Sequence, residues 1–332
     1  MRQTPALPLP AGVFALDATP LTVPAGGTRR YVQELLSALA TEFPGARFLP
    51  LTDQDGRSRN WLRRRWWLAG VQLEMKQLGV HLFHGADFSV PYLPFRPSVM
   101  TLLDLSPWRF PDASPRVRTR TPLLLGLGLA TMVVTLTEAV RREAIEAFRL
   151  SPARVTAVPL AASPSFRPVE TTPAARPYFL YVGSTESRKN LPMLRNAWQA
   201  LRQRHDVDLR ITGEAPPVSD RELSALYSGA AACLYPSLYE GFGLPILEAM
   251  QCGTPVIASR TPAAAEVAGG AALLLDPNDT RAWRDAMEAA LLGHLREACR
   301  ERGLARARQF SWAATARQTF AVYQEALGRF HA

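Results

Sequence analysis

Short apolar runs alternate with longer amphipathic stretches along most of the chain. In the first half, the apolar runs predict strands at 13–16, 81–84, 99–103, 132–136 and 155–158. Apolar positions at helical spacing predict helices at 30–41, 61–78, 116–130 and 138–148. Thr137 is expected to cap the last of these helices. Strands that alternate with helices in this way are typical of a parallel α/β sheet.

The alternation stops at residues 163–177, which contain four prolines in a polar context and are interpreted as an interdomain linker. It then resumes with strands predicted at 178–182, 208–212, 232–235, 255–259 and 271–275. Helices are predicted at 191–204, after Ser219, after Pro245, twice within 280–309, and from Ser311 to about 327. The sequence therefore predicts an α/β fold with two doubly wound, Rossmann-like parallel-sheet domains that face a cleft.

Composition narrows the class of protein. The chain has 332 residues, of which 47% are hydrophobic, so intrinsic disorder is excluded and about two domains are expected. The three cysteines lie far apart in the sequence, and this favours reduced thiols in a reducing compartment. The first 25 residues lack the apolar core of a secretory signal. The most apolar run, residues 122–136, is shorter than the roughly 20 residues of a spanning helix, so a cytoplasmic location is expected.

The net charge of +9 favours an anionic partner. Part of this charge lies between Arg57 and Lys76, where six basic residues and one acidic residue are interleaved with Trp61, Trp66 and Trp67. One interpretation is a peripheral contact with an anionic membrane, with the indole rings at the interface. An equally good interpretation is a solvated basic helix that packs its tryptophans inward. Nucleic-acid binding rests on charge alone and is not expected.

The segment from Ser237 to Glu248 carries the strongest chemical signal. Glu240 and Glu248 are separated by seven residues across a glycine-containing loop that joins a predicted strand to a predicted helix. Pro245 suits the first helical position, which would leave the backbone N–H groups of Gly243 and Leu244 free to bind a phosphate. Glu248 would lie in the first turn and bind ribose hydroxyls, and Glu240 would hold a second sugar. The alternative is that both glutamates only complement a helix dipole.

A second segment, residues 181–191, joins a predicted strand to a helix through a turn at Gly183. Arg188 and Lys189 stand just before the helix, and Lys189 is one of only two lysines in the chain. A guanidinium and an ammonium together suit a diphosphate. The alternative is a solvated charge pair, but cations at a helix N-terminus oppose its dipole and need an anion beside them.

These two segments resemble the E-x7-E signature and the Gly-x4-Arg-Lys-Asn segment of retaining glycosyltransferases with the GT-B fold. The family is glycosyltransferase family 4, also called group 1, and the motifs are similar to those of its mannosyltransferase-like members. Shorter matches occur in the family's order along nearly the whole chain, at residues 26–32, 83–85, 104–106, 110–111, 275–277 and 310–312.

The resemblance implies a retaining, metal-independent transferase without a cofactor. It would move a hexose from a nucleotide-sugar donor, with GDP-mannose slightly preferred, to a glycan or lipid-linked acceptor in polysaccharide or glycoconjugate biosynthesis. Residues 1–165 would bind the acceptor, residues 178–310 would bind the sugar nucleotide, and a helix in 311–332 would pack back toward the N-terminal domain.

The resemblance also implies roles for single residues. Arg188 and Lys189 would hold the diphosphate leaving group, and Glu240 would bind the hydroxyls of the transferred sugar. Glu248 would bind the ribose. The remaining donor contacts would come from backbone groups, those of Gly27, Gly183, Phe242, Gly243 and Leu244.

Two of the chain's departures from the family pattern bear on donor binding. Leu103 stands before Asp104 where the family often has a histidine that contacts the donor sugar, and His84 is a candidate substitute. The connection Gly213–Val218 is short where the family usually has an extra helix and strand that line the base. These departures motivate the alternative of a sugar-nucleotide-binding partner subunit with weak or no catalysis. Asp53 and Asp55 have the spacing of a metal motif, but acidic loop residues usually form turns, so no metal is expected.

Overall fold

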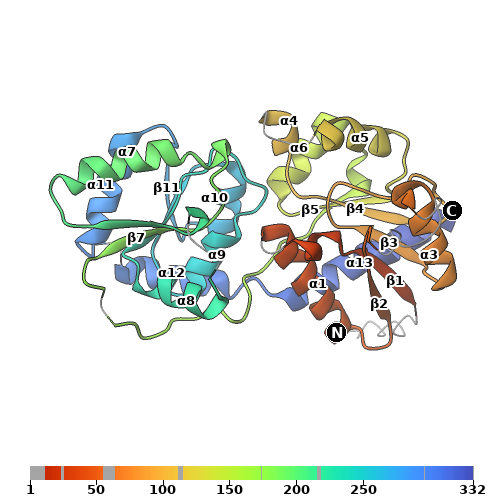
Figure 1. Ribbon diagram of the computed structural model, residues 1–332, viewed down its shortest axis with the longest axis horizontal. Coiled ribbons are helices and arrows are strands. Elements are labelled where there is room, and N and C mark those ends of the chain that lie inside the picture. Colours follow the sequence, from red (N-terminus) through yellow and green to blue (C-terminus); the bar gives the residue numbers. More distant parts are fainter. Residues whose placement is uncertain are drawn as a thin grey trace, which may run out of the picture.

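The computed structural model describes residues 12–23, 26–54, 64–110, 115–172, 174–214, 218–294 and 296–331. They form two lobes, each built around one parallel sheet (Figure 1). We call the lobe that contains β1–β6 the first lobe and the lobe that contains β7–β11 the second lobe.

The sheet of the first lobe has six strands in the order β2-β1-β3-β4-β5-β6, all parallel. The strands are β1 (Val13–Asp17), β2 (Arg47–Leu51), β3 (Leu82–Gly85), β4 (Ser98–Leu102), β5 (Met132–Thr135) and β6 (Val155–Ala157). All of these except β2 were predicted, to within one or two residues at each end. In β2, Pro50 and the exposed Arg47 interrupt the apolar run, as suits an edge strand.

The helices of the first lobe are α1 (Gly27–Glu42), α3 (Val71–Gln77), α4 (Ser106–Arg109), α5 (Pro115–Gly126) and α6 (Glu138–Phe148). Thr137 caps α6 as predicted, because its side chain accepts a hydrogen bond from the N–H of Val140. The predicted helix at 61–78 is a π-helical turn (Trp66–Gly70) followed by α3, and its beginning lies outside the described residues. Trp66 is buried, and Trp67 packs edge-on against Phe83, so both indoles point inward.

The sheet of the second lobe has five parallel strands in the order β11-β10-β9-β7-β8. The strands are β7 (Tyr178–Tyr181), β8 (Asp208–Ile211), β9 (Ala232–Tyr235), β10 (Val256–Ser259) and β11 (Leu273–Leu275). The helices are α7 (Leu191–Arg202), α8 (Asp220–Gly229), α9 (Leu244–Gln251), α10 (Pro262–Ala268), α11 (Thr280–Leu291) and α12 (Arg296–Ala307). Among these, α10 was not predicted, and Ser219 caps α8 as expected.

Both sheets reverse their strand order once, between β1 and β3 and between β7 and β9. In an open α/β sheet, the loops at the carboxyl ends of the strands beside such a switch point form the ligand-binding crevice. The loop after β1 leads to Gly27, the loop after β7 holds Arg188 and Lys189, and the loop after β9 holds Glu240. The topology therefore places the predicted site residues at the two switch points.

The chain passes between the lobes twice. It leaves the first lobe after β6 and crosses through residues 158–177, and it returns after α12 to form α13 (Trp312–His331). This last helix packs against α1, β4 and β5 of the first lobe (Figure 1). Its buried side chains Phe320 and Tyr323 contact the ring of Phe14 in β1.

None of the helices in the described part of the chain combines the length and the apolar character needed to cross a membrane.

Candidate active site

The loops after β7 and β9 lie against each other at the switch point of the second sheet. The backbone N–H of Leu238 donates a hydrogen bond of 2.8 Å to the carbonyl oxygen of Arg188. Arg188 and Lys189 belong to a single turn of 3-10 helix that ends at Asn190, whose φ of 55° is left-handed. Two segments about fifty residues apart are thereby joined into one unit.

Three charged side chains meet inside this unit. The Lys189 Nζ lies 2.5 Å from the Glu240 Oε1, and the Arg188 Nη1 lies 3.1 Å from the Glu240 Oε2. Lys189 and Glu240 are buried. Burial by itself raises the pKa of Glu240, but the two adjacent cations outweigh it and bring this pKa below its ordinary value. Glu240 is therefore an ionised carboxylate at neutral pH.

This cluster supplies the anion that the two cations need. A bound diphosphate was expected in this place, whereas in the structure Glu240 faces both cations and Glu186 accepts a further hydrogen bond of 2.7 Å from the Arg188 Nε. The Arg188 side chain is 16% exposed, and a ligand phosphate would share its guanidinium with Glu186 and Glu240.

The helix after Glu240 begins one residue earlier than predicted. Gly243 precedes it with a φ of 100°, a left-handed conformation that favours glycine, and α9 starts at Leu244, so Pro245 is its second residue. Glu248 is the fifth residue and lies in the second turn, so the prediction that it belongs to the first turn is wrong. The side chains of Phe242 and Leu244 are buried in the core, which leaves their backbone groups as the ones available to a ligand.

Glu248 is buried among polar partners from two different lobes. Its Oε2 accepts a hydrogen bond of 2.9 Å from the Tyr227 hydroxyl, and its Oε1 lies 3.7 Å from the Nε of Arg30. Burial raises the pKa of Glu248, and Arg30 and Tyr227 offset only part of this effect. Because 3.7 Å exceeds a hydrogen-bond distance, the Oε1 keeps capacity for hydroxyl donors.

Arg30 was not predicted as a site residue. It lies in the first turn of α1 and reaches across to the second lobe, where its guanidinium forms two hydrogen bonds of 2.6 and 3.0 Å with Asp220. Since Asp220 is 190 positions away in the sequence, no local pattern could reveal this pair. Gly26 and Gly27 indicated a ligand-binding loop in the sequence, but they gave no indication that Arg30 takes part in the site.

Gly27 and Gly183 occupy the turns that the prediction assigned to donor binding. Gly27 is the first residue of α1, and no described atom lies within 4 Å of where its Cβ would be, so the start of α1 is open. Gly183 has a φ of 150°, and a Cβ there would lie 2.9 Å from the Tyr181 hydroxyl oxygen. Gly213 lies against this turn, since a Cβ on it would be 2.3 Å from the Gly183 carbonyl oxygen.

Comparison with known proteins gives the family. A sequence model described as glycosyl transferases group 1 matches residues 176–292. The O-antigen chain mannosyltransferase B of Escherichia coli is 32% identical to this chain, over 94% of this chain and 99% of that protein. The chain belongs to the group 1 glycosyltransferases.

Solved structures agree on the fold of this glycosyltransferase. Sucrose-phosphate synthase from Thermosynechococcus elongatus superposes with a TM-score of 0.73 at 22% identity, over 96% of this chain and 99% of that one. Anabaena Alr3699/HepE, solved in complex with UDP and glucose, gives a TM-score of 0.69 at 16% identity, over 95% and 99% of the two chains. The predicted GT-B fold and the predicted glycosyltransferase activity are confirmed, and the relatives give no support to a non-catalytic partner subunit.

In this glycosyltransferase the first lobe contacts the loop that holds Glu240. The Tyr239 hydroxyl accepts a hydrogen bond of 2.9 Å from the N–H of Leu105 and donates one of 2.8 Å to Glu143. At Gly241, a Cβ would lie only 1.9 Å from the Leu103 carbonyl oxygen. Leu103, which replaces the family's histidine, therefore contacts this loop through its backbone.

His84 does not take the place of that histidine. Its ring is completely buried and lies between the hydroxyls of Tyr323 and Thr101, each 2.7 Å from a ring nitrogen. Burial lowers the pKa of His84 to about 3. It is a neutral core residue of the first lobe rather than a donor contact.

Three carboxylates of the glycosyltransferase gather at the carboxyl edge of the first sheet. They are Asp17, Asp87 and Asp104, and burial raises the pKa values of Asp17 and Asp104. Within the described residues, no group of three or more His, Cys, Asp or Glu side chains has the arrangement of a metal site. Asp55, half of the candidate metal motif, lies outside those residues.

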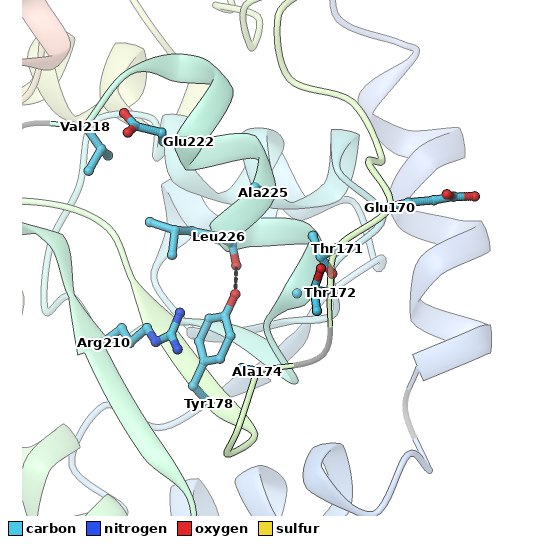
Figure 2. A pocket seen from close by; sticks show the side chains of 11 residues that line it. Glu170, Thr171, Thr172, Ala174, Tyr178, Arg210, Val218, Glu222, Ala225 and Leu226 are labelled. Atoms are coloured by element: carbon cyan, nitrogen blue, oxygen red, sulfur yellow. Dashed lines mark hydrogen bonds between the residues drawn. The ribbon is translucent and has the colours of Figure 1, made fainter.

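A surface hollow lies away from these residues, on the second lobe (Figure 2). Its wall is formed by the linker, β7, β8 and α8. The Arg210 guanidinium stacks on the Tyr178 ring at 3.6 Å from its centroid, and the Tyr178 hydroxyl donates to the Leu226 carbonyl oxygen. Because Arg188, Lys189, Glu240 and Glu248 do not line it, the hollow is separate from the candidate active site.

Proposed function

We propose that this glycosyltransferase transfers a hexose from a nucleotide sugar to a glycan or lipid-linked acceptor with retention of anomeric configuration. The observation that carries the proposal is the meeting of Arg188, Lys189 and Glu240 at the switch point of the second sheet. A switch point is where open α/β sheets bind nucleotides, and two cations from one turn suit the diphosphate of such a donor.

In this proposal Arg188 and Lys189 bind the diphosphate and stabilise the charge that develops as it leaves. The positive charge that a metal ion would supply comes from these side chains, so the reaction needs no metal. Glu240 turns its carboxylate from the cations toward hydroxyls of the transferred sugar, and Glu248 accepts hydroxyls of the ribose through its Oε1. Backbone N–H groups of Gly27, Gly183, Phe242, Gly243 and Leu244 complete the donor contacts.

Retention follows from attack on the face that the leaving group departs from. The bond between the anomeric carbon and the phosphate oxygen breaks, the bond to the acceptor oxygen forms on the same face, and the acceptor proton passes to the leaving phosphate. No protein nucleophile is used. The contacts of Tyr239 and Gly241 with the first lobe exclude water from the donor and thereby limit hydrolysis.

Mannose is the sugar we propose, and GDP-mannose the donor. The Escherichia coli relative named O-antigen chain mannosyltransferase B aligns over nearly the full length of both chains, which favours a mannosyl transfer in polysaccharide assembly. The complex of Anabaena Alr3699/HepE with UDP and glucose supports a sugar nucleotide in this fold, although its base and sugar differ from those proposed.

A ligand screen followed by a product assay tests the proposal. GDP, UDP and their sugars are first compared by thermal shift, where a bound nucleotide raises the melting temperature by mass action. Transfer is then measured with and without EDTA, and the anomeric configuration of the product is read by NMR. An α-linked mannoside formed equally in EDTA is expected from GDP-mannose. A β-linked product contradicts retention, and loss of activity in EDTA contradicts metal independence.

We also propose a peripheral contact of the first lobe with anionic lipid, at the inner face of the plasma membrane. Leu68, Phe95, Leu123 and Leu127 are 40–64% exposed, and exposed arginines accompany them at positions 64, 65, 96, 116 and 118. The segments are neighbours, because the Tyr92 N–H donates to the Trp67 carbonyl oxygen and the Arg120 guanidinium lies over the Trp67 ring. Apolar side chains rimmed by arginine are typical of membrane-surface binding.

Liposome flotation tests this contact. Binding to vesicles that contain phosphatidylglycerol, weakened by salt and absent with neutral phosphatidylcholine, is expected. The double variant Leu123→Ser, Leu127→Ser should reduce it while leaving transfer to a water-soluble acceptor intact. Equal flotation with both lipids contradicts the proposal.

A further inference from the structure

Arg30 makes the only described ion pairs that join α1 of the first lobe to carboxylates of the second lobe, and one of these carboxylates is Glu248. It forms the bidentate pair with Asp220 at 2.6 and 3.0 Å and lies 3.7 Å from the Glu248 Oε1. Its guanidinium is 5.0 Å from the centre of the buried Phe166 ring, which fixes the plane of the fork. A surface arginine would have none of these constraints.

We propose that Arg30 is a positioning residue for the donor, one that holds Glu248 as an oriented carboxylate and does so only when the lobes are together. This inference rests on the proposed ribose contact of Glu248. It adds that one lobe completes the nucleotide site of the other, so donor binding and lobe closure favour each other.

The surroundings of Glu248 show why it needs this partner. Its side chain is 5% exposed, and burial favours the neutral acid. The titratable and charged groups that face it are Arg30 of α1, Asp220 and Tyr227 of α8, Cys233 of β9, and Cys252 after α9. Burial keeps both thiols and the tyrosine neutral by raising their pKa values.

Among these described groups around Glu248, Arg30 is the one cation and Asp220 is the one carboxylate. Asp220 acts on Glu248 in the opposite sense, since its negative charge raises the pKa of Glu248 while Arg30 lowers it. A protonated Glu248 loses the charge-assisted hydrogen bonds that a carboxylate forms with two hydroxyls. By lowering the pKa of Glu248, the charge of Arg30 therefore extends ribose binding to lower pH.

The opposite signs give a sharp experiment. Arg30→Gln and Asp220→Asn both break the same interlobe ion pair, but they remove opposite charges from beside Glu248. The affinity for GDP-mannose, and for UDP-glucose in parallel, is measured by calorimetry across about pH 5 to pH 8, a range in which these diesters do not titrate. The Michaelis constants for the donor are measured over the same range.

We expect Arg30→Gln to weaken donor binding about tenfold near pH 5 and much less near pH 8, because one charge-assisted hydrogen bond is worth roughly tenfold in affinity. The loss should appear in the donor KM rather than in kcat. In the wild type, donor affinity should decline as the pH falls and Glu248 is protonated. Asp220→Asn should move this acidic decline to lower pH, because it removes a negative charge from beside Glu248. Glu248→Gln should abolish the decline, and adding Arg30→Gln to it should change the pH profile no further.

Arg29→Gln is the matched control. This neighbour carries the same charge, but its guanidinium donates to the carbonyl oxygens of Leu21 and Val23 in its own lobe, and no ion pair links it to the described residues of the second lobe. It should leave the acidic decline in place. Thermal melting of every variant establishes that the chain is folded.

Two results overturn the inference alone. One is that Arg30→Gln and Asp220→Asn weaken binding equally at every pH, which is the behaviour of a tether that acts only through closure. The other is an unchanged profile in Arg30→Gln. If Glu248→Gln leaves donor binding intact, the proposed ribose contact is wrong, and the inference fails with it. The Glu248 variant alone gives this result, so it is distinguishable from a failure of the Arg30 inference.

Discussion

Glu240 and Glu248 are both buried glutamates, but their surroundings shift their pKa values in opposite directions. Two cations at 2.5 and 3.1 Å lower the pKa of Glu240 in spite of burial. For Glu248, burial is offset only by a more distant arginine and one hydroxyl, and the pKa rises. The spacing of the two residues in the sequence gives no indication of this difference, because the cations come from other segments of the chain.

The first prediction concerns Glu240 and the stability of the fold. Its folded-state pKa is lowered, so the ionised pair stabilises the fold above the ordinary pKa of 4.5 and this stabilisation is lost as the pH falls through the folded-state value. At neutral pH, Glu240→Gln should destabilise the chain by about 3 kcal/mol, because Lys189 is left buried without its partner.

Urea unfolding at about pH 7 and pH 3 checks this prediction, since the difference between wild type and Glu240→Gln should shrink on acidification. The double variant Lys189→Met, Glu240→Gln is the control, and it should recover much of the lost stability without recovering transfer. A difference that stays the same at both pH values would show that the pair does not stabilise the fold through its charge.

The second prediction concerns His84. Burial lowers its pKa to about 3 from 6.5, so the unfolded chain binds a proton that the folded chain does not. Stability is complete above about pH 6.5 and falls below it, at up to about 1.4 kcal/mol per pH unit, toward the folded-state pKa. In His84→Asn the fall between pH 7 and pH 5 should be shallower, as measured by urea midpoints. A parallel fall in both proteins would contradict a buried neutral imidazole.

At the scale of elements, the loop between β9 and α9 is shaped by its contact with the other lobe. Tyr239 exchanges hydrogen bonds with Leu105 and Glu143, and Gly241 lies directly on the Leu103 carbonyl. The glycine at 241 is required here by close approach, since its φ is not left-handed. The loop and the first lobe therefore share one surface, and the position of Glu240 depends on both.

The third prediction follows from this contact. In Gly241→Ala the new Cβ would overlap the Leu103 carbonyl oxygen, so the loop must move away from the first lobe. A displacement of about 1 Å at a reacting centre costs about 100-fold in rate, and we expect kcat to fall by that order. Gly328→Ala, in the open face of α13, is the control and should leave kcat unchanged. Normal turnover by Gly241→Ala would show that the closed contact is unnecessary for transfer.

Most elements of the fold could be predicted from the sequence, because the buried strands are uninterrupted apolar runs and several helices carry side-chain caps such as Thr137 and Ser219. The edge strand β2 was missed because its apolar run is broken by a proline. The short helix α10 was missed because its alanines carry no amphipathic pattern. The residues of the site could be placed on loops, but their pairing across lobes, as for Arg30, depends on contacts that only the folded chain creates.

At the scale of the whole molecule, α13 is the last element in the sequence but part of the core of the first lobe. Phe320 and Tyr323 pack on β1, and the Tyr323 hydroxyl lies 2.7 Å from the Nδ1 of His84 in β3. The first lobe is complete only after the second has been synthesised. Its stability therefore depends on residues that follow the entire second lobe in the sequence.

The fourth prediction is that Tyr323→Ala destabilises the first lobe by about 3–5 kcal/mol, because it removes a completely buried ring. Tyr323→Phe keeps the ring and should cost about 1–3 kcal/mol, since only the hydrogen bond to His84 is lost. Hydrogen exchange read by mass spectrometry should show faster exchange in β1, β3 and β4 and unchanged exchange in β7, β9 and β10. Equal acceleration in both sheets would mean that the lobes unfold as one unit.

The two crossings of the chain, through residues 158–177 and between α12 and α13, also set how the lobes can move. A single covalent connection would permit swivelling about several axes. With a pair of connections side by side, torsion is restrained and bending about the line through them is the motion that remains. Bending about this line would part and rejoin the same two faces, so the Arg188–Glu240 cluster would return to the same place beside Leu103, Asp104 and Leu105.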